Sequence, residues 1–434
     1  MSASSIKTPH IPAPPPARLY FLDWVRIVAF FLLILYHVGM YYVSWDWHVK
    51  SPYAGDALEG LMMLSSPWRL SLLFLVAGVA SSMMLAKVPA AGFARKRSWR
   101  LLVPLVFGML VIVPPQPFCE VIEKFGYTGS YGDFLGLYLH NYRGFSTGPG
   151  THLVMPTWNH LWFVVYLWTY SMLLAALFGI GGRQLARLSA AAGRLLTGWS
   201  LLLLPAALLA LYRLGIMTRF PVTHALVDDW FNHATYFSVF LTGALVARQG
   251  AVWASMETMR FAALGIALSV WAMFKVYASM PDDVLSADTM LWLLPAQRVV
   301  FALGQWAAMV AACGFARRHL NFDSAKRRYL TEAVFPVYIV HQTLIVVMAH
   351  YLKPVRLAPG TEGAILVVLT LCGSFAVFEL VRRVAVLRPL FGLGTQDEAG
   401  QRSNSLHTPA QLRRESQPAS QAWDRHLRRQ SPFY

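Results

Sequence analysis

Long apolar segments dominate the hydrophobic pattern of this chain, and most of them are long enough to cross a lipid bilayer as a helix. Polar and basic stretches separate these segments, as in a chain that passes through a membrane repeatedly. The pattern therefore predicts an all-α fold, a polytopic membrane helix bundle of about ten transmembrane helices. The predicted spans are residues 20–42, 58–84, 100–117, 158–178, 199–216, 233–248, 261–279, 291–313, 330–351 and 363–387.

The first apolar segment is unusual because it carries three polar side chains. Asp23 and Arg26 are three residues apart, and His37 lies eleven residues beyond Arg26. At about 100° per residue, these spacings place all three on one stripe of a helix, with His37 about 16 Å along the axis from Arg26. Ionisable groups inside a membrane normally face a bundle interior or a wet cavity. The stripe is therefore a candidate site, although an interfacial ion pair and a packing histidine would also explain it.

Composition excludes an ordinary soluble protein. Of the 434 residues, 56% are hydrophobic and only 13% are charged, whereas a soluble domain is nearer a quarter charged. The net charge of +16 is not gathered into a continuous basic surface, so we expect no nucleic-acid partner. The three cysteines lie far apart and form no metal-binding or disulfide pattern, so no metal site is predicted.

Basic residues fall mainly in one set of connections, which predicts the orientation. Residues 1–19, 87–100, 181–194, 248–260, 316–328 and the C-terminal tail contain about 26 of the 37 lysines and arginines. The opposite set contains about six. Because cytoplasmic loops are enriched in Lys and Arg, we expect both termini to be cytoplasmic. The longest loop on the opposite side, residues 117–157, is expected to form a partial lid.

Three regions follow from this pattern. Residues 1–19 form a Pro-rich cytoplasmic tail without the pattern of a cleaved signal peptide. Residues 20–390 form the transmembrane domain. Residues 391–434 are polar and rich in Gln, Ser and Arg, and we expect a disordered cytoplasmic tail.

Candidate chemistry lies at the polar positions of the spans. Histidines near span ends are His37, His160 in TWNHLWF and His341 in VYIVHQ. The basic residues within or at the edge of spans are Arg26, Arg69, Arg213, Lys275 and Arg298. The polar side chains that could meet in one buried cavity are Asp23, His37, Asn159, His160, Glu332 and His341. Each of them alone is weak evidence, and His341, near a helix end, could equally be hydrogen-bonded to a neighbouring carbonyl.

A cytoplasmic basic cluster, Arg95 to Arg100, stands directly before the third span. Such a cluster usually anchors the topology. Together with a histidine deeper in the membrane, it suits an anionic donor that enters from the cytoplasm and meets a general base. No HExxH, GxSxG or P-loop pattern competes with this interpretation.

At these residues the sequence resembles the integral membrane acyltransferases of the acyltransferase 3 family, over nearly the whole chain to about residue 390. The first helix of that family carries Leu-Asp, then an Arg and a His separated by ten residues, here Leu22, Asp23, Arg26 and His37. Its Arg-x-x-Arg motif corresponds to Arg97 and Arg100, followed by Pro104. Residues 160–163 (HLWF) and 338–341 (YIVH) also match. Within the family the chain is most similar to the glucan biosynthesis protein C group, through residues 20–23, 47–49, 51, 320–322 and 324–325.

The resemblance implies a bacterial inner-membrane enzyme that transfers an acyl group from cytoplasmic acyl-CoA to a hydroxyl of a periplasmic glucan or another extracytoplasmic glycan. In the glucan biosynthesis protein C group the acyl group is succinyl. Acyl-CoA is then a co-substrate, the acceptor is a carbohydrate, and no other cofactor than this donor is needed. Catalytic roles are implied for His37 as base, Asp23 and Arg26, the last either contacting the donor or pairing with Asp23. The donor phosphates are expected at Arg97 and Arg100. The remaining substrate-binding candidates are His48, Asn159, His160, Trp162, Glu332 and His341.

A second function class remains open at this stage. A transporter or exporter of acylated sugars or other anions could use the same basic entrance and buried polar residues. A ten-helix bundle does not separate the two classes. The Arg-x-x-Arg entrance combined with the Arg-to-His spacing favours the enzyme, because a transporter has no need of that combination.

Overall fold

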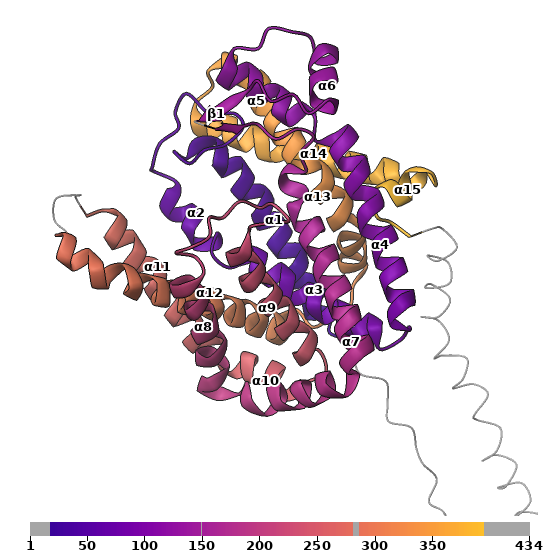
Figure 1. The fold of residues 1–434 in the computed structure, drawn as a ribbon, viewed down its shortest axis with the longest axis vertical. Coiled ribbons are helices and arrows are strands. Elements are labelled where there is room, and N and C mark those ends of the chain that lie inside the picture. The colour runs from indigo at the N-terminus through magenta and orange to yellow at the C-terminus, as the bar shows by residue number, and fades with distance from the viewer. Residues whose placement is uncertain (1–17, 149, 281–285, 395–434) are drawn as a thin grey trace, which may run out of the picture.

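The structure is a computed structural model that describes residues 18–148, 150–280 and 286–394 (Figure 1). Nearly all of its regular structure is helical. The first helices are α1 (Tyr20–Tyr42), α2 (Glu59–Ser65), α3 (Arg69–Leu85), α4 (Ala90–Phe107), α5 (Pro115–Phe125), α6 (Tyr131–Leu139) and α7 (Trp162–Leu195). The later helices are α8 (Gly198–Gly215), α9 (Trp230–Val246), α10 (Gly250–Thr258), α11 (Arg260–Ala278), α12 (Ala287–His319), α13 (Ala325–Leu352), α14 (Pro359–Arg383) and α15 (Leu387–Leu390). Shorter elements are a π-helix (Gly108–Ile112), two 3₁₀ turns (Asn159–Leu161 and Lys353–Val355) and an antiparallel pair, β1 (Ser146–Gly148) and β2 (Thr151–His152).

The membrane bundle predicted from the sequence is confirmed. Eight described segments are long and apolar enough to cross a bilayer, and two bent helix pairs bring the number to ten if each pair is one span. One pair joins the α4 and π-helix segment to α5 at 41°, where Pro114 and Pro115 cannot donate backbone hydrogen bonds. The other pair joins α9 to α10 at 112°. The segment 248–260, expected as a short turn, is therefore largely the helix α10.

Helix α1 contributes side chains to two apolar cores. Its first turns pack Phe21 and Val25 among residues of α3, α8, α9, α10 and α12. Its later turns pack Leu33 and Val38 among residues of α4, α7, α13 and α14. Because both cores hold it, α1 is a rigid element from which a polar side chain can be placed accurately.

Helices α3 and α9 approach each other closely because each has a glycine at the crossing. A Cβ atom on Gly78 would lie 1.9 Å from the carbonyl oxygen of Phe240. A Cβ atom on Gly243 would lie 2.1 Å from the carbonyl oxygen of Leu75. Small residues permit such backbone contact between membrane helices, where packing rather than the hydrophobic effect drives association.

The segment 117–157, expected as a loop, is folded, and with α5 it forms one end of the molecule, at the top of Figure 1. It has its own apolar core, which includes Phe134, Tyr138 and Met155. The Tyr138 hydroxyl donates a hydrogen bond to the carbonyl oxygen of Met109 at 2.8 Å, which ties α6 to the π-helix. We call this end of the molecule the α6 end.

The opposite end carries α10 (Figure 1), and we call it the α10 end. The predicted basic connections meet there. Arg317, at the end of α12, forms an ion pair with Glu257 of α10 at 3.2 Å. Ser189, in the second half of α7, donates to the carbonyl oxygen of Leu245 at 2.6 Å. Most of both predicted tails, residues 1–17 and 395–434, lies outside the described residues.

Candidate active site

Two histidines from distant parts of the sequence meet at the membrane level. Nδ1 of His37, on α1, lies 2.9 Å from Nε2 of His341, on α13. The two rings stack with centroids 5.1 Å apart. His341 is fully buried, whereas His37 is only partly buried. His37 is therefore the more accessible of the two rings.

The hydrogen bonds of this pair define which nitrogen carries each proton. Nδ1 of His341 lies 2.6 Å from the carbonyl oxygen of Tyr338. A carbonyl can only accept, so the Nδ1–H of His341 is the donor, and Nε2 of a neutral His341 ring has a lone pair. That lone pair accepts the Nδ1–H of His37. The second nitrogen of a neutral His37, Nε2, is then unprotonated and can accept a proton.

His160 completes a group of three histidines, which we call the histidine cluster (His37, His160 and His341). Its ring is perpendicular to that of His341, with centroids 5.2 Å apart. Its Nε2 donates to the carbonyl oxygen of Ile339 at 3.0 Å, and its own carbonyl accepts a hydrogen bond from the Tyr338 hydroxyl. His160 thus holds the 3₁₀ turn before α7 against α13. Among the described residues, no group of His, Cys, Asp or Glu side chains has a geometry that could hold a metal ion.

A glutamine network (Gln116, Gln342, Asn159 and His48) extends from the cluster toward the α6 end. The Gln116 amide nitrogen donates to Thr343 at 2.6 Å and to His160 at 3.3 Å. Its oxygen accepts from Asn159 at 3.1 Å and from Gln342 at 3.0 Å. Each polar atom of Gln116, which is fully buried, therefore has two partners. Such a satisfied network holds its members in one arrangement.

The network continues to a charged group. Gln342 donates to Nε2 of His48 at 3.2 Å, and Nδ1 of His48 lies 2.6 Å from the Glu120 carboxylate. Lys124 donates to the other carboxylate oxygen at 2.9 Å. A line of polar side chains thus runs from the histidine cluster to a partly exposed lysine on α5.

The structure brings together His37, His48, Asn159, His160 and His341, all of which the sequence singled out. Sequence reasoning missed the two glutamines that join them. Gln342 follows His341 directly, and Gln116 follows a Pro-Pro pair at the start of α5. A polar amide beside a helix-breaking proline pair within an apolar segment is the signal that could have identified Gln116.

Arg97 and Arg100, which we call the basic mouth, lie near the middle of α4. Arg97 is partly buried, and its guanidinium lies 3.2 Å from the Ser171 hydroxyl and 3.4 Å from that of Ser81. Arg100 is exposed and donates to the carbonyl oxygen of Gly392 at 3.1 Å. Neutral partners leave the positive charge of Arg97 available to an anion.

Asp23 and Arg26 do not pair with each other among the ion pairs of the described residues. The Asp23 carboxylate instead contacts Arg18 at 3.3 Å and the buried Arg327 of α13. Arg26 donates to the carbonyl oxygen of Thr331 at 3.1 Å, and its buried Nε has no partner within the described structure. One of the two roles considered for Arg26, a pair with Asp23, is therefore not what the structure has. Asp23 lies near the first turn of α1, far along the helix from His37.

Two other candidates lie away from the histidine cluster. Glu332 is 3.6 Å from Arg388 of α15, and its side chain is 36% exposed. Trp162 stacks near His224, with ring centroids 4.4 Å apart, and near Tyr236 at 5.7 Å. Trp162 therefore belongs to an aromatic wall between α7 and α9 rather than to the hydrogen-bonded cluster.

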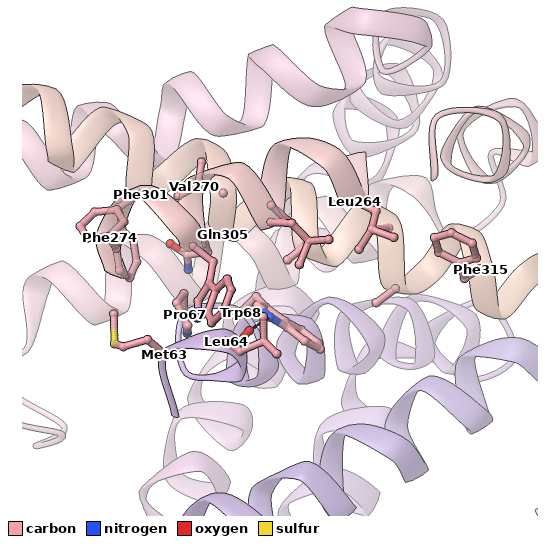
Figure 2. Close-up of a pocket in the computed structure, with 17 residues that line it drawn as sticks. Met63, Leu64, Pro67, Trp68, Leu264, Val270, Phe274, Phe301, Gln305 and Phe315 are labelled. Atoms are coloured by element: carbon pink, nitrogen blue, oxygen red, sulfur yellow. Dashed lines mark hydrogen bonds between the residues drawn. The ribbon is translucent and has the colours of Figure 1, made fainter. Parts of the chain in front are cut away.

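A pocket of about 540 Å³ lies elsewhere, between α2 and the turn that follows it on one side and α11 and α12 on the other (Figure 2). Figure 2 shows Met63, Leu64 and Trp68 facing Leu264 and Phe274 across it. Its walls are apolar apart from Gln305 and the Trp68 indole nitrogen. None of the candidate site residues lines it. Such a surface suits hydrocarbon chains rather than a charged donor.

Comparison with known proteins gives the family of the chain. Residues 19–379 match the acyltransferase domain of the acyltransferase 3 family. The glucans biosynthesis protein C of Escherichia coli K12 is 24% identical over 388 residues, which is 87% of this chain and 95% of that protein. The protein of the same name from Salmonella typhimurium LT2 is 25% identical over 401 residues, which is 88% of this chain and 95% of that protein. No solved structure matches the chain.

The matched domain spans most of the chain and includes the histidine cluster, the glutamine network and the basic mouth. The chain therefore belongs to the acyltransferase 3 family and is a multi-pass membrane O-acyltransferase.

Proposed function

We propose that the protein moves an acyl group from cytoplasmic acyl-CoA to a hydroxyl of a glucan or another glycan outside the cytoplasm, with Nε2 of His37 as the general base. The observation that carries this proposal is the hydrogen-bonded series from His37 through His341 to the carbonyl of Tyr338. It directs the free lone pair of His37 away from α13, and His37 is the partly exposed member of the cluster.

The reaction balances without any further reagent. The acceptor hydroxyl gives its proton to Nε2 of His37 while its oxygen attacks the thioester carbonyl. The bond between the carbonyl carbon and sulfur then breaks, and the coenzyme A thiolate leaves and takes the proton. A positioned base is worth roughly 10²–10⁴ in rate, because a hydroxyl alone has a pKa far above 7. His341 orients the base and does not touch the substrate.

The donor is proposed to enter through the basic mouth at the α10 end. Arg97 has neutral hydrogen-bond partners, and Arg100 is exposed on the same helix. Arginine suits phosphate because its planar fork donates paired hydrogen bonds and keeps its charge. The bound phosphates would leave the pantetheine arm to extend through the bundle toward His37.

The acceptor is proposed to approach from the α6 end, where His48 and Asn159, the partly exposed members of the glutamine network, carry an imidazole and an amide. Carbohydrate hydroxyls can both donate to and accept from such groups. The names of the relatives point to glucan biosynthesis, and the resemblance of the sequence implies succinyl as the acyl group.

The experiment that tests the proposal uses purified protein in detergent, where no transport is possible. The protein is mixed with succinyl-CoA and a β-glucan oligosaccharide, and the mass of the glycan is measured by mass spectrometry. Covalent acylation that requires His37 supports the enzyme. Unmodified glycan, together with export of acylated glycan by vesicles, would favour the transporter class instead. Mass spectrometry of periplasmic glycans from cells with and without the gene then identifies the natural product.

A further inference from the structure

Arg69 is a buried cation without a counter-charge. It is the first residue of α3 and only 3% exposed. Its guanidinium carbon lies 3.4 Å from the centre of the Tyr36 ring. Neither Nε nor Nη1 has a hydrogen-bond partner, and none of the ion pairs among the described residues includes Arg69. Stacking on an aromatic ring stabilises such a cation but leaves its Nε–H and Nη1–H groups unsatisfied.

This arrangement is costly unless something else binds there. Burying a charge without a partner is among the most unfavourable events in protein folding. Other buried or half-buried cations of the molecule show the contrast. Lys50 donates to the carbonyl oxygens of Met40 and Trp45 at 2.7 and 2.8 Å, and Arg327 contacts two carboxylates.

Arg69 also lies beside the proposed base. Tyr36, on which it stacks, precedes His37 on α1, and the Tyr36 and His37 rings meet edge to face with centroids 5.9 Å apart. One aromatic ring therefore separates the unpaired guanidinium from the place where the thioester would react.

We infer that Arg69 binds a carboxylate at the far end of the transferred acyl group and so makes the enzyme select dicarboxylic acyl donors. This inference rests on the proposed function. A carboxylate accepts charge-assisted hydrogen bonds from a guanidinium, and the unpartnered Nε–H and Nη1–H of Arg69 are available to donate them. The distance across one ring is within reach of a short dicarboxylic chain whose carbonyl lies at His37. The donor phosphates are assigned to the basic mouth, on a different helix, so they do not compete for Arg69.

The test measures binding separately from transfer. The probes are thioether analogues of succinyl-CoA and butyryl-CoA, which cannot transfer their acyl group and differ mainly in the terminal carboxylate. Binding to the full chain in detergent is measured by calorimetry without acceptor, for wild type, Arg69→Gln and Arg69→Lys. Arg213→Gln is the matched control, because Arg213 stacks on Phe301 at 3.8 Å but already donates to Gln305 at 3.4 Å.

We expect wild type to bind the succinyl analogue more tightly than the butyryl analogue. Arg69→Gln should weaken the succinyl analogue by at least tenfold and leave the butyryl analogue within twofold. Arg69→Lys should retain part of the preference, because it keeps the charge without the fork. Arg213→Gln should keep the full preference. An Arg69→Gln variant that is folded by thermal melting and binds both analogues as wild type does would overturn the inference, as would equal loss for both.

Transfer assays keep the two proposals distinguishable. If wild type binds the succinyl analogue through Arg69 but never acylates a glycan, the proposed function fails and the carboxylate site stands. If wild type acylates glycans from both succinyl-CoA and butyryl-CoA with equal kcat/KM, the proposed function stands and the carboxylate site fails. If Arg69→Gln does not fold, the test uses Arg69→Lys. A smaller preference for the succinyl analogue than in wild type supports the carboxylate site, and an unchanged preference contradicts it.

Discussion

His37 and His341 are 304 positions apart in the chain, yet their ring nitrogens lie 2.9 Å from each other. The contact joins α1 to α13 and gives both rings a defined tautomer. His341 is locked by the Tyr338 carbonyl, so it can only accept from His37 when both rings are neutral. The direction of the free lone pair on His37 is therefore a property of the fold and not of a bound ligand.

Replacement of His37 should abolish transfer without unfolding the protein. His37→Ala should lower kcat by roughly 10²-fold or more, because the base is lost. His37→Gln keeps the polarity but cannot take a proton at neutral pH, so it should be nearly as inactive. In wild type, transfer should fall as the pH is lowered, because a protonated His37 cannot act as a base. Acyl transfer and thermal stability are measured on the same preparations. A Gln variant with near wild-type transfer would show that His37 is a packing residue.

Replacement of His341 should impair orientation of the base rather than donor binding. His341→Leu removes the acceptor for the His37 N–H. We expect kcat to fall roughly 10- to 100-fold, by analogy with the loss of groups that orient metal-binding histidines. KM for acyl-CoA should change little. His341→Gln can still accept through its amide oxygen and should recover part of kcat. A loss of kcat that Gln and Leu share equally would argue against an orienting role.

Replacement of both arginines of the basic mouth should weaken donor binding. Each lost charged hydrogen bond contributes roughly 1.5–3 kcal/mol, so Arg97→Ala with Arg100→Ala should raise KM for acyl-CoA by tenfold or more. Lysine at both positions should rescue in part. Ser171→Ala is the control, since it removes a neutral partner of Arg97 and keeps the charge. An unchanged KM in the double alanine variant would mean that the two residues only anchor the topology.

The spans were predictable because hydrophobicity along the chain reports membrane crossing directly. The residues at which helices bend, and those to which helices extend beyond their apolar stretch, were not predictable. Helix α7 continues to Leu195 across a kink at Gly181, although its apolar stretch ends earlier. Segment 250–258 forms α10 with Val252 and Trp253 buried, a short helix that a charge-based assignment treats as a connection.

The site was predictable in part for a similar reason. A histidine in an apolar segment is conspicuous, so His37, His160 and His341 could be singled out. Whether they contact one another depends on which sides of the helices pack together. Helical periodicity placed Asp23 on the stripe of His37 correctly, yet a stripe is more than three turns long. Its two ends meet different neighbours, Arg327 at one and His341 at the other. The unpaired state of Arg69 depends equally on tertiary packing.

Labelling from one side of the membrane should establish the orientation. The basic connections at the α10 end are expected to be cytoplasmic because of their Lys and Arg excess. In a Cys372→Ser background, we expect Arg95→Cys to react with an impermeant thiol reagent only after cells are opened. Tyr142→Cys, at a position 42% exposed near the α6 end, should react in intact cells, given access through the outer membrane. Labelling of position 95 from outside would reverse the proposed donor and acceptor sides.

Asp23 should act through stability and not through chemistry. It and Asp323 are the carboxylates that contact Arg327, which is 1% exposed. Asp23→Asn removes one of these two charges and leaves the Asp323 contact of 2.7 Å. Because Arg327 keeps one of its two partners, the substitution should lower the free energy of unfolding by about 1–3 kcal/mol. This loss would appear as a lower melting temperature. The folded fraction should transfer acyl groups with a kcat within a few fold of wild type, because Asp23 lies near the other end of α1 from His37. Arg18→Gln is the control, because it removes only the exposed partner of Asp23. Loss of such a surface ion pair costs under about 1 kcal/mol. A variant that melts as wild type does but loses transfer 100-fold would place Asp23 in the reaction itself.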